Sequence, residues 1–124
     1  MTKGAGVLPD GPQNVAVGET AMFTVTMTPP KPIQSVNWKF DGKNIFTFGA
    51  KNTTGSGYEG RITFFTSTGS LELRNVTLSD SGYYNVTIVA SDVSVQFGDA
   101  TLKVYGEEMF IIASLSMLNG DYAD

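Results

Sequence analysis

The sequence predicts an all-β fold, a single sandwich of two sheets, and three observations lead to this prediction. Apolar and polar residues alternate over short runs such as 20–25, the period of a half-buried strand. Turn-forming residues recur at short spacing, supplied by 14 glycines and five prolines. No helical apolar period extends over a useful length. A chain of 124 residues allows one domain with a real core, and we place that domain at residues 7–105.

The turn signals divide the chain into strands, which we take in order. Asp10-Gly11-Pro12 interrupts the first strand, and the prolines at 29–32 end the second. Asp41-Gly42 suits a type I′ hairpin between the third and fourth strands, because both residues tolerate positive φ. The expected strands cover residues 7–8 with 13–17, 20–28, 34–40, 43–48, a poorly defined 49–53, 61–66, 70–76, 82–90 and 98–105.

The run Asp80-x-Gly82-x-Tyr84-x-Val86 is the most informative motif. In an immunoglobulin sandwich it marks the turn into the strand that carries the second inter-sheet cysteine, and here Val86 stands at the cysteine position. A tyrosine two residues earlier is typical of the tyrosine corner, in which the ring fills the core and the hydroxyl satisfies backbone. An Asp-Ser-Gly turn before an ordinary strand is the simpler alternative.

Upstream residues favour the immunoglobulin interpretation. Val25 stands where the first cysteine is expected, and the single tryptophan, Trp38, follows it by 13 residues. The pattern Cys…Trp…Cys has therefore become Val25…Trp38…Val86. Arg61 and Asp80 match a pair that forms a salt bridge across one end of variable-type domains. The interval from Trp38 to Arg61 holds two further strands, so we predict a V-set sandwich without the inter-sheet disulfide.

Composition argues against several classes of function. The net charge is −4, with eight scattered Lys and Arg, so a nucleic-acid partner is not expected. The chain contains no histidine and no cysteine, which removes the commonest general base, thiol chemistry and the usual zinc ligands. We expect no enzyme activity, catalytic residue, metal site or cofactor. No apolar run approaches the roughly 20 residues that span a bilayer, so this fragment is not expected to insert into a membrane.

Three Asn-x-Ser/Thr sequences make Asn52, Asn75 and Asn85 candidates for N-glycosylation. Asn52 lies in a loop rich in glycine and threonine, and strand alternation turns the other two side chains toward solvent. The absence of cysteine usually indicates a reducing compartment. The three sequons and the variable-type length point instead to a protein that is extracellular, either on a cell surface or secreted.

Residues 71–84, with the following Val86-x-Ile88 and the Gly-Tyr58-Glu-Gly-Arg61 sequence, resemble the amino-terminal variable-type domain of the carcinoembryonic-antigen-related cell adhesion molecules (CEACAM family). The resemblance covers about residues 7–105 and is to a non-mammalian, fish-like member. Amino-terminal domains of CD2- and SLAM-type receptors share the missing disulfide. The resemblance implies head-to-head binding through the G-F-C-C′ face, formed here by the strands at 98–105, 82–90, 34–40 and 43–48. It also implies a glycan on the opposite sheet, at Asn75.

Strand alternation gives a candidate binding surface on that face. With Val86 and Trp38 in the core, Thr87, Val89 and Lys39 point outward. The strand at 43–48 is apolar on both sides, so one of its pairs must face solvent; alternatively it folds over the core edge and the valines are incidental surface residues. The candidate partner-binding residues are Lys39, Ile45, Thr47, Thr87, Val89 and Val93. Asn85 departs from the family, because a glycan there would stand near this face.

Two functions remain open at the level of sequence. The first is a cell-adhesion domain that binds a second copy of itself or a related surface protein, normally tethered by later domains. The second is an immune receptor or decoy head of CD2/SLAM-like type that binds an unrelated or foreign ligand. A muscle-type intracellular repeat is disfavoured by the sequons. The segment 106–124 is expected to be a carboxy-terminal extension or linker, and we assign it no function.

Overall fold

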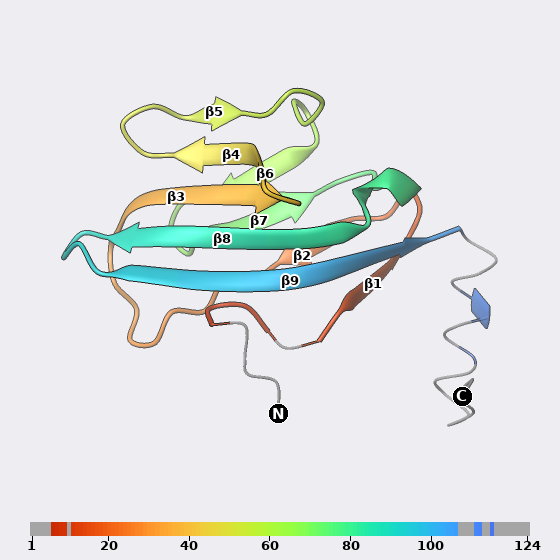
Figure 1. Ribbon diagram of the computed structural model, residues 1–124, viewed down its shortest axis with the longest axis horizontal. Coiled ribbons are helices and arrows are strands. Elements are labelled where there is room, and N and C mark those ends of the chain that lie inside the picture. Colours follow the sequence, from red (N-terminus) through yellow and green to blue (C-terminus); the bar gives the residue numbers. More distant parts are fainter. Residues whose placement is uncertain (1–5, 10, 107–110, 113–114, 116–124) are drawn as a thin grey trace.

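The computed structural model describes residues 6–9, 11–106, 111–112 and 115, and the expected extension beyond 106 lies largely outside the described residues. The expected all-β sandwich of two sheets is confirmed. Figure 1 shows a six-stranded sheet, ordered β1-β9-β8-β3-β4-β5, in front of a three-stranded sheet, ordered β2-β7-β6. The strands are β1 (Gln13–Ala16), β2 (Ala21–Phe23), β3 (Ile33–Phe40), β4 (Lys43–Phe48), β5 (Thr53–Thr54), β6 (Ile62–Phe65), β7 (Ser70–Leu73), β8 (Gly82–Ala90) and β9 (Val95–Tyr105).

Several strands differ from their expected bounds: β5 covers Thr53–Thr54 rather than 49–53, and β7 ends at Leu73 rather than at 76, so Asn75 lies outside the strand. For β2 and β9 the difference follows from hydrogen bonding. Strand β2 ends at Phe23 because the N–H of Val25 donates to the hydroxyl of Ser70 (2.9 Å) instead of continuing the ladder. Strand β9 begins at Val95 rather than at residue 98, because the tight turn after β8 pairs Val95 with Val89 at once. The longer β9 adds outward-facing positions that the sequence prediction did not contain.

The core forms where the missing disulfide would lie. Val25 and Val86 are both buried, and Trp38 between them in sequence is wholly enclosed. The Trp38 Nε1–H donates to the carbonyl of Gly69 (3.0 Å), so its one polar group is satisfied. Phe23 packs against the Trp38 ring with centroids 5.5 Å apart. Branched aliphatic and aromatic packing therefore holds the two sheets together without a covalent bridge.

Tyr84 forms a tyrosine corner at the start of β8. Its hydroxyl donates to the backbone carbonyl of Asp80 (2.7 Å), and burial raises the pKa of this hydroxyl. Its ring packs on Phe23 and Phe40, with centroids 4.8 and 4.7 Å away. Gly82 permits this close turn, since a Cβ there would lie 2.6 Å from the Phe40 ring.

A salt bridge between Arg61 and Asp80 closes the same end of the sandwich. The Asp80 carboxylate is buried and also accepts the N–H of Thr77 (2.8 Å), while the Arg61 Nε–H donates to the carbonyl of Arg74 (3.2 Å). The Arg61 guanidinium lies 5.6 Å from the centre of the Tyr58 ring. These contacts join β6 to the 3₁₀ turn Leu78–Asp80, which leads into β8.

Candidate binding face

The outer face of the six-stranded sheet, called the binding face below, is set by alternation along β8 and β9. In β8 the side chains of Tyr84, Val86, Ile88 and Ala90 are buried, so the intervening residues project from the opposite side. Cross-strand pairing extends them into rows. One row contains Phe97, Thr87, Asn37 and Thr47, and the next contains Asp99, Asn85, Lys39 and Asn44.

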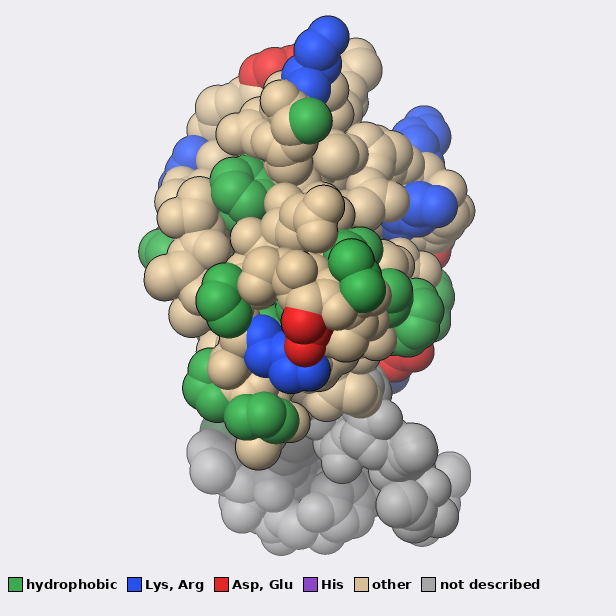
Figure 2. Space-filling view, turned by 90° about the vertical axis from the view of Figure 1, so that its left-hand side faces the viewer, with side chains coloured by type: hydrophobic (Ala, Val, Ile, Leu, Met, Phe, Trp, Pro, Cys, Tyr) green, Lys and Arg blue, Asp and Glu red, His purple; other side chains and the backbone are tan. Residues whose placement is uncertain are grey.

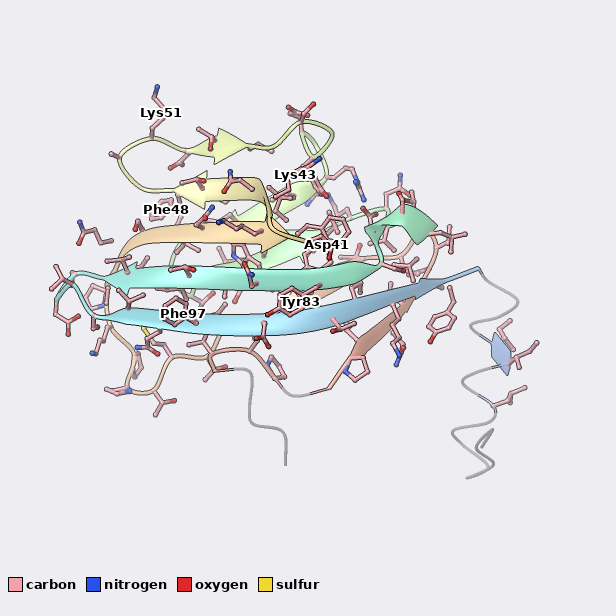
Figure 3. The ribbon with its side chains drawn as sticks, viewed as in Figure 1. Asp41, Lys43, Phe48, Lys51, Tyr83 and Phe97 are labelled. Carbon is pink, nitrogen blue, oxygen red and sulfur yellow. The ribbon has the colours of Figure 1, made fainter. Side chains whose placement is uncertain are left out.

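Exposed apolar side chains gather on β8, β9 and the turn between them. Phe97 is 64% exposed, Tyr83 45%, Val95 47% and Val93 75%. Figure 3 shows Phe97 and Tyr83 on neighbouring strands, on the side of the sheet turned away from the three-stranded layer. Aromatic residues left in water on a flat sheet are costly for a monomer and are enriched in protein interfaces.

Strand β4 corrects one sequence expectation. Ile45 was expected on the binding face, but its side chain is fully buried. The pairing of β3 with β4 shifts between Trp38 and Lys39, so Ile45 is an extra residue without a partner in β3. This bulge turns both Ile45 and Phe46 toward the core, and normal alternation resumes with Thr47. A strict two-residue period could not reveal the bulge.

The polar half of the face lies over β3 and β4. Asn37 Nδ2–H donates to the side chain of Asn44 and to the hydroxyl of Thr47 (3.2 Å). The Thr47 hydroxyl also donates to Asn44 (3.2 Å). These three side chains satisfy one another and present a neutral hydrogen-bonding surface. Lys39 projects beside them and forms no salt bridge with any other described residue.

Tyr83 is held in position at the end of the face where β3 meets β4. Its hydroxyl donates to Asp99 (3.0 Å), and this hydrogen bond raises the pKa of Tyr83. Its backbone N–H donates to the carboxylate of Asp41 (3.0 Å), and its carbonyl accepts the N–H of Asp41 (2.7 Å). The ring is therefore presented in one place although nearly half of it is in water.

The turn between β8 and β9 presents Val93 at its tip. Val93 has φ of 62°, a left-handed conformation that is rare for a β-branched residue. Neighbouring groups fix the turn: Asp92 accepts the N–H of Ser94 (3.0 Å) and its hydroxyl (2.6 Å), and pairs with Lys31 (3.1 Å). The Ser94 hydrogen bonds, assisted by Lys31, lower the pKa of Asp92 to about 2. Figure 2 faces this end and shows an acidic and a basic group together among hydrophobic side chains.

A shallow depression of about 340 Å³ opens in the middle of the face. Its lining combines aromatic, neutral polar and charged groups. The lining residues are Lys39, Tyr83, Asn85, Val86, Thr87, Phe97, Gly98 and Asp99. This mixture can accept hydrogen-bonding and apolar groups of a partner together.

The structure therefore brings together most of the expected binding residues. Lys39, Thr47, Thr87 and Val89 share the face, with Val93 at its edge, whereas Ile45 belongs to the core. Three exposed residues of the face, Tyr83, Val95 and Phe97, are absent from the candidate residues predicted from the sequence. The available signal was alternation: Tyr83 precedes inward Tyr84, and an earlier start of β9 would have placed Val95 and Phe97 on the same side.

The three glycosylation candidates occupy different places. Asn52 is exposed beside the edge strand β5, and its Oδ1 accepts the N–H of Gly49 (3.2 Å). Asn75 is exposed after β7, at a φ of 54° that asparagine tolerates. Asn85 is half-buried in β8, paired with Lys39 on one side and Asp99 on the other. Only Asn85 stands in the middle of the binding face.

The described residues contain no group of three or more acidic side chains placed to hold a metal ion. Across the same residues, every helix is too short or too polar to span a bilayer.

Two sheets packed face to face, with the paired Arg61 and Asp80 and the Tyr84 corner, define a variable-type immunoglobulin sandwich. The family model of the immunoglobulin V-set domain matches residues 9–105 of the sequence, and the chain belongs to this family.

Solved structures share the fold at low sequence identity. The first ig-like domain of human CD48 antigen has a TM-score of 0.73 and 16% identity, with 86% of this chain and 89% of that chain covered. Murine CEACAM1b has a TM-score of 0.62 and 23% identity, with 77% and 51% covered. The CD2-binding domain of CD58 has a TM-score of 0.57 and 21% identity, with 76% and 52% covered.

Proposed function

We propose that the domain is a cell-adhesion or recognition module whose binding face contacts another protein on a cell surface. The observation that carries the proposal is the exposed apolar group on β8, β9 and their turn, with Phe97 at 64% exposure beside a satisfied polar surface. An apolar centre with a polar rim is the usual anatomy of a modest protein interface. V-set domains are typically extracellular or at the cell surface, which agrees with the three sequons.

The nature of the partner is the finer part of the proposal. The sequence resemblance at residues 71–84 supports a CEACAM-type domain that binds a second copy or a close relative. The similarity to the CD2-binding domain of CD58 supports the alternative, a receptor head with an unrelated ligand. Both use the same face, so the two differ only in what covers it.

The charges on the face favour a second copy. Asp99 and Lys39 lie in one row on either side of Asn85. If two domains meet face to face about a two-fold axis that passes Asn85 parallel to β8, Lys39 of each copy approaches Asp99 of the other. Such an arrangement contributes specificity and gives an ionic partner to Lys39, which forms no salt bridge within the described part of the chain.

The proposal is tested on protein made in bacteria, which carries no glycan. Sedimentation velocity over increasing concentration should show reversible dimers for the parent chain. Phe97→Asp should weaken the association at least tenfold, because it places a charge in the apolar centre. Phe65→Asp is the matched control: Phe65 is also exposed, but it lies on β6 of the other sheet and should leave association unchanged. Equal association of both variants contradicts the proposed face.

Charge exchange separates the two kinds of partner. Lys39→Asp should weaken self-association through repulsion from Asp99, and the double variant Lys39→Asp with Asp99→Lys should recover it. Recovery in the double variant is expected only when the domain binds itself. A parent chain that stays monomeric at every concentration overturns homophilic binding and favours the receptor with an unrelated ligand.

A further inference from the structure

The sequon Asn85-Val86-Thr87 lies in β8, and β8 pairs with β9 on one side and β3 on the other. Val86 is buried, so Asn85 and Thr87 both project from the binding face. We propose that Asn85 is an N-glycosylation site whose glycan covers this face and closes it to a protein partner. The inference rests on the proposed function, since a closed face matters only if the open face binds.

The neighbours of Asn85 show what a glycan would cover. Asn85 lies opposite Asp99 and Lys39, about 5 Å away across each strand pair. Tyr83 and Thr87 are its neighbours along β8 on the same side, and Phe97 lies opposite Thr87. A glycan that leaves the sheet at Asn85 therefore starts in the middle of both the apolar group and the charged row.

The surface around Asn85 also has room for the first sugar. The depression of about 340 Å³ includes Asn85 in its lining, together with the aromatic residues Tyr83 and Phe97. A pyranose can place its C–H face on an aromatic ring and its hydroxyl and acetamido groups on charged side chains. Lys39 and Asp99 line the same depression and offer one donor and one acceptor. The first sugar can thus lie against the sheet.

Because Asn85 would lie on the two-fold axis, a glycan there is expected to hinder binding of a second copy strongly. In the two-fold pairing proposed above, Asn85 of one domain meets Asn85 of the other, so two glycans would compete for the same space. Asn52 lies beside the edge strand β5 and Asn75 after β7 in the opposite sheet, so neither occupies this position. Asn85 is the sequon whose occupancy separates an open from a closed face.

The experiment uses a chain with Asn52→Gln and Asn75→Gln, so that only Asn85 can be modified. It is made in bacteria and also secreted from mammalian cells, and glycopeptide mass analysis measures occupancy of Asn85. Sedimentation velocity should show dimers for the bacterial protein and monomers for the glycosylated fraction, with association weakened at least tenfold. Secretion in the presence of tunicamycin, an inhibitor of N-glycosylation, leaves every residue of the binding face unaltered and should restore association to the level of the bacterial protein, which also controls for folding.

The possible failures are distinct. Secreted protein with an unmodified Asn85 overturns the inference, as does a glycosylated fraction that associates as well as the bacterial protein. In both cases dimers of the bacterial protein leave the proposed function intact. Bacterial protein that remains monomeric overturns homophilic binding itself, and the closing role of the glycan falls with it.

Discussion

The two sides of the six-stranded sheet are built from the same strands and differ in what fixes their residues. On the inner side, Trp38, Tyr84 and Val86 are almost completely buried, and the polar atoms of Trp38 and Tyr84 have one backbone partner each. On the outer side, Tyr83 and Phe97 remain about half exposed or more. Burial of the inner side chains stabilises the fold. The exposed aromatic residues of the outer side contribute little to stability unless a partner covers them.

The loss of the disulfide makes this contrast sharper. In the cysteine-containing sandwich a covalent bond holds the sheets together whatever the packing. Here Val25, Val86 and Trp38 must do so by burial and close packing. The inner side therefore tolerates little change, while substitutions on the outer side are expected within about 0.5 kcal/mol in stability, except where the backbone is strained, as at Val93.

The largest effect is expected at Trp38. Trp38→Ala should lower the free energy of unfolding by about 3–5 kcal/mol, because it leaves a cavity between the sheets. Since that variant can fail to fold, Trp38→Phe is the companion: it keeps a ring but leaves the Gly69 carbonyl without its donor, at a cost of about 1–3 kcal/mol. Urea denaturation followed by fluorescence or circular dichroism measures both. A loss below 0.5 kcal/mol for both variants would contradict the central place of the indole.

The next largest effect is expected at Ile45, and it tests whether the bulge in β4 turns this side chain toward the core. Ile45→Ala should destabilise the domain by about 2–4 kcal/mol, as expected for a fully buried isoleucine. Thr47→Ala, two residues away on the outer side, should change stability by less than about 0.5 kcal/mol. Equal effects at the two positions in chemical denaturation would show that Ile45 faces outward after all.

The sequence predicted the inner side well and the outer side only in part. Hallmarks such as Trp38 and Tyr84 occupy fixed spacings because a buried site accepts few residue types. The bulge at Ile45 depends on a shift in pairing between two strands, which no single strand encodes. The exposure of Phe97 depends on where β9 begins, and that is set by the turn before it. Sequence patterns within one strand therefore predict the buried positions reliably. They predict less well the orientation of residues that depends on how two strands pair.

A smaller effect is expected at the tip of the outer side. Val93→Asn should raise the free energy of unfolding by about 1 kcal/mol, because asparagine tolerates the left-handed backbone that a β-branched residue resists. Val95→Asn is the matched control, since Val95 is also exposed but lies in β9 with extended backbone. It should not gain stability. Thermal unfolding compares the two, and a gain at both positions would attribute the effect to polarity instead of backbone strain.

The smallest effect concerns the turn that carries Val93. The Ser94 hydrogen bonds and the Lys31 ammonium hold the pKa of Asp92 at about 2, below its usual 3.8. A depressed pKa in the folded state stabilises the fold above pH 3.8, and this contribution is lost as the pH falls through about 2. Carboxyl-detected NMR should show this low titration midpoint in the parent chain. Ser94→Ala should raise the pKa of Asp92, because it removes the hydroxyl hydrogen bond, which is the largest influence, while the backbone N–H at position 94 can still donate. An unchanged midpoint would show that the hydroxyl does not stabilise the ionised carboxylate.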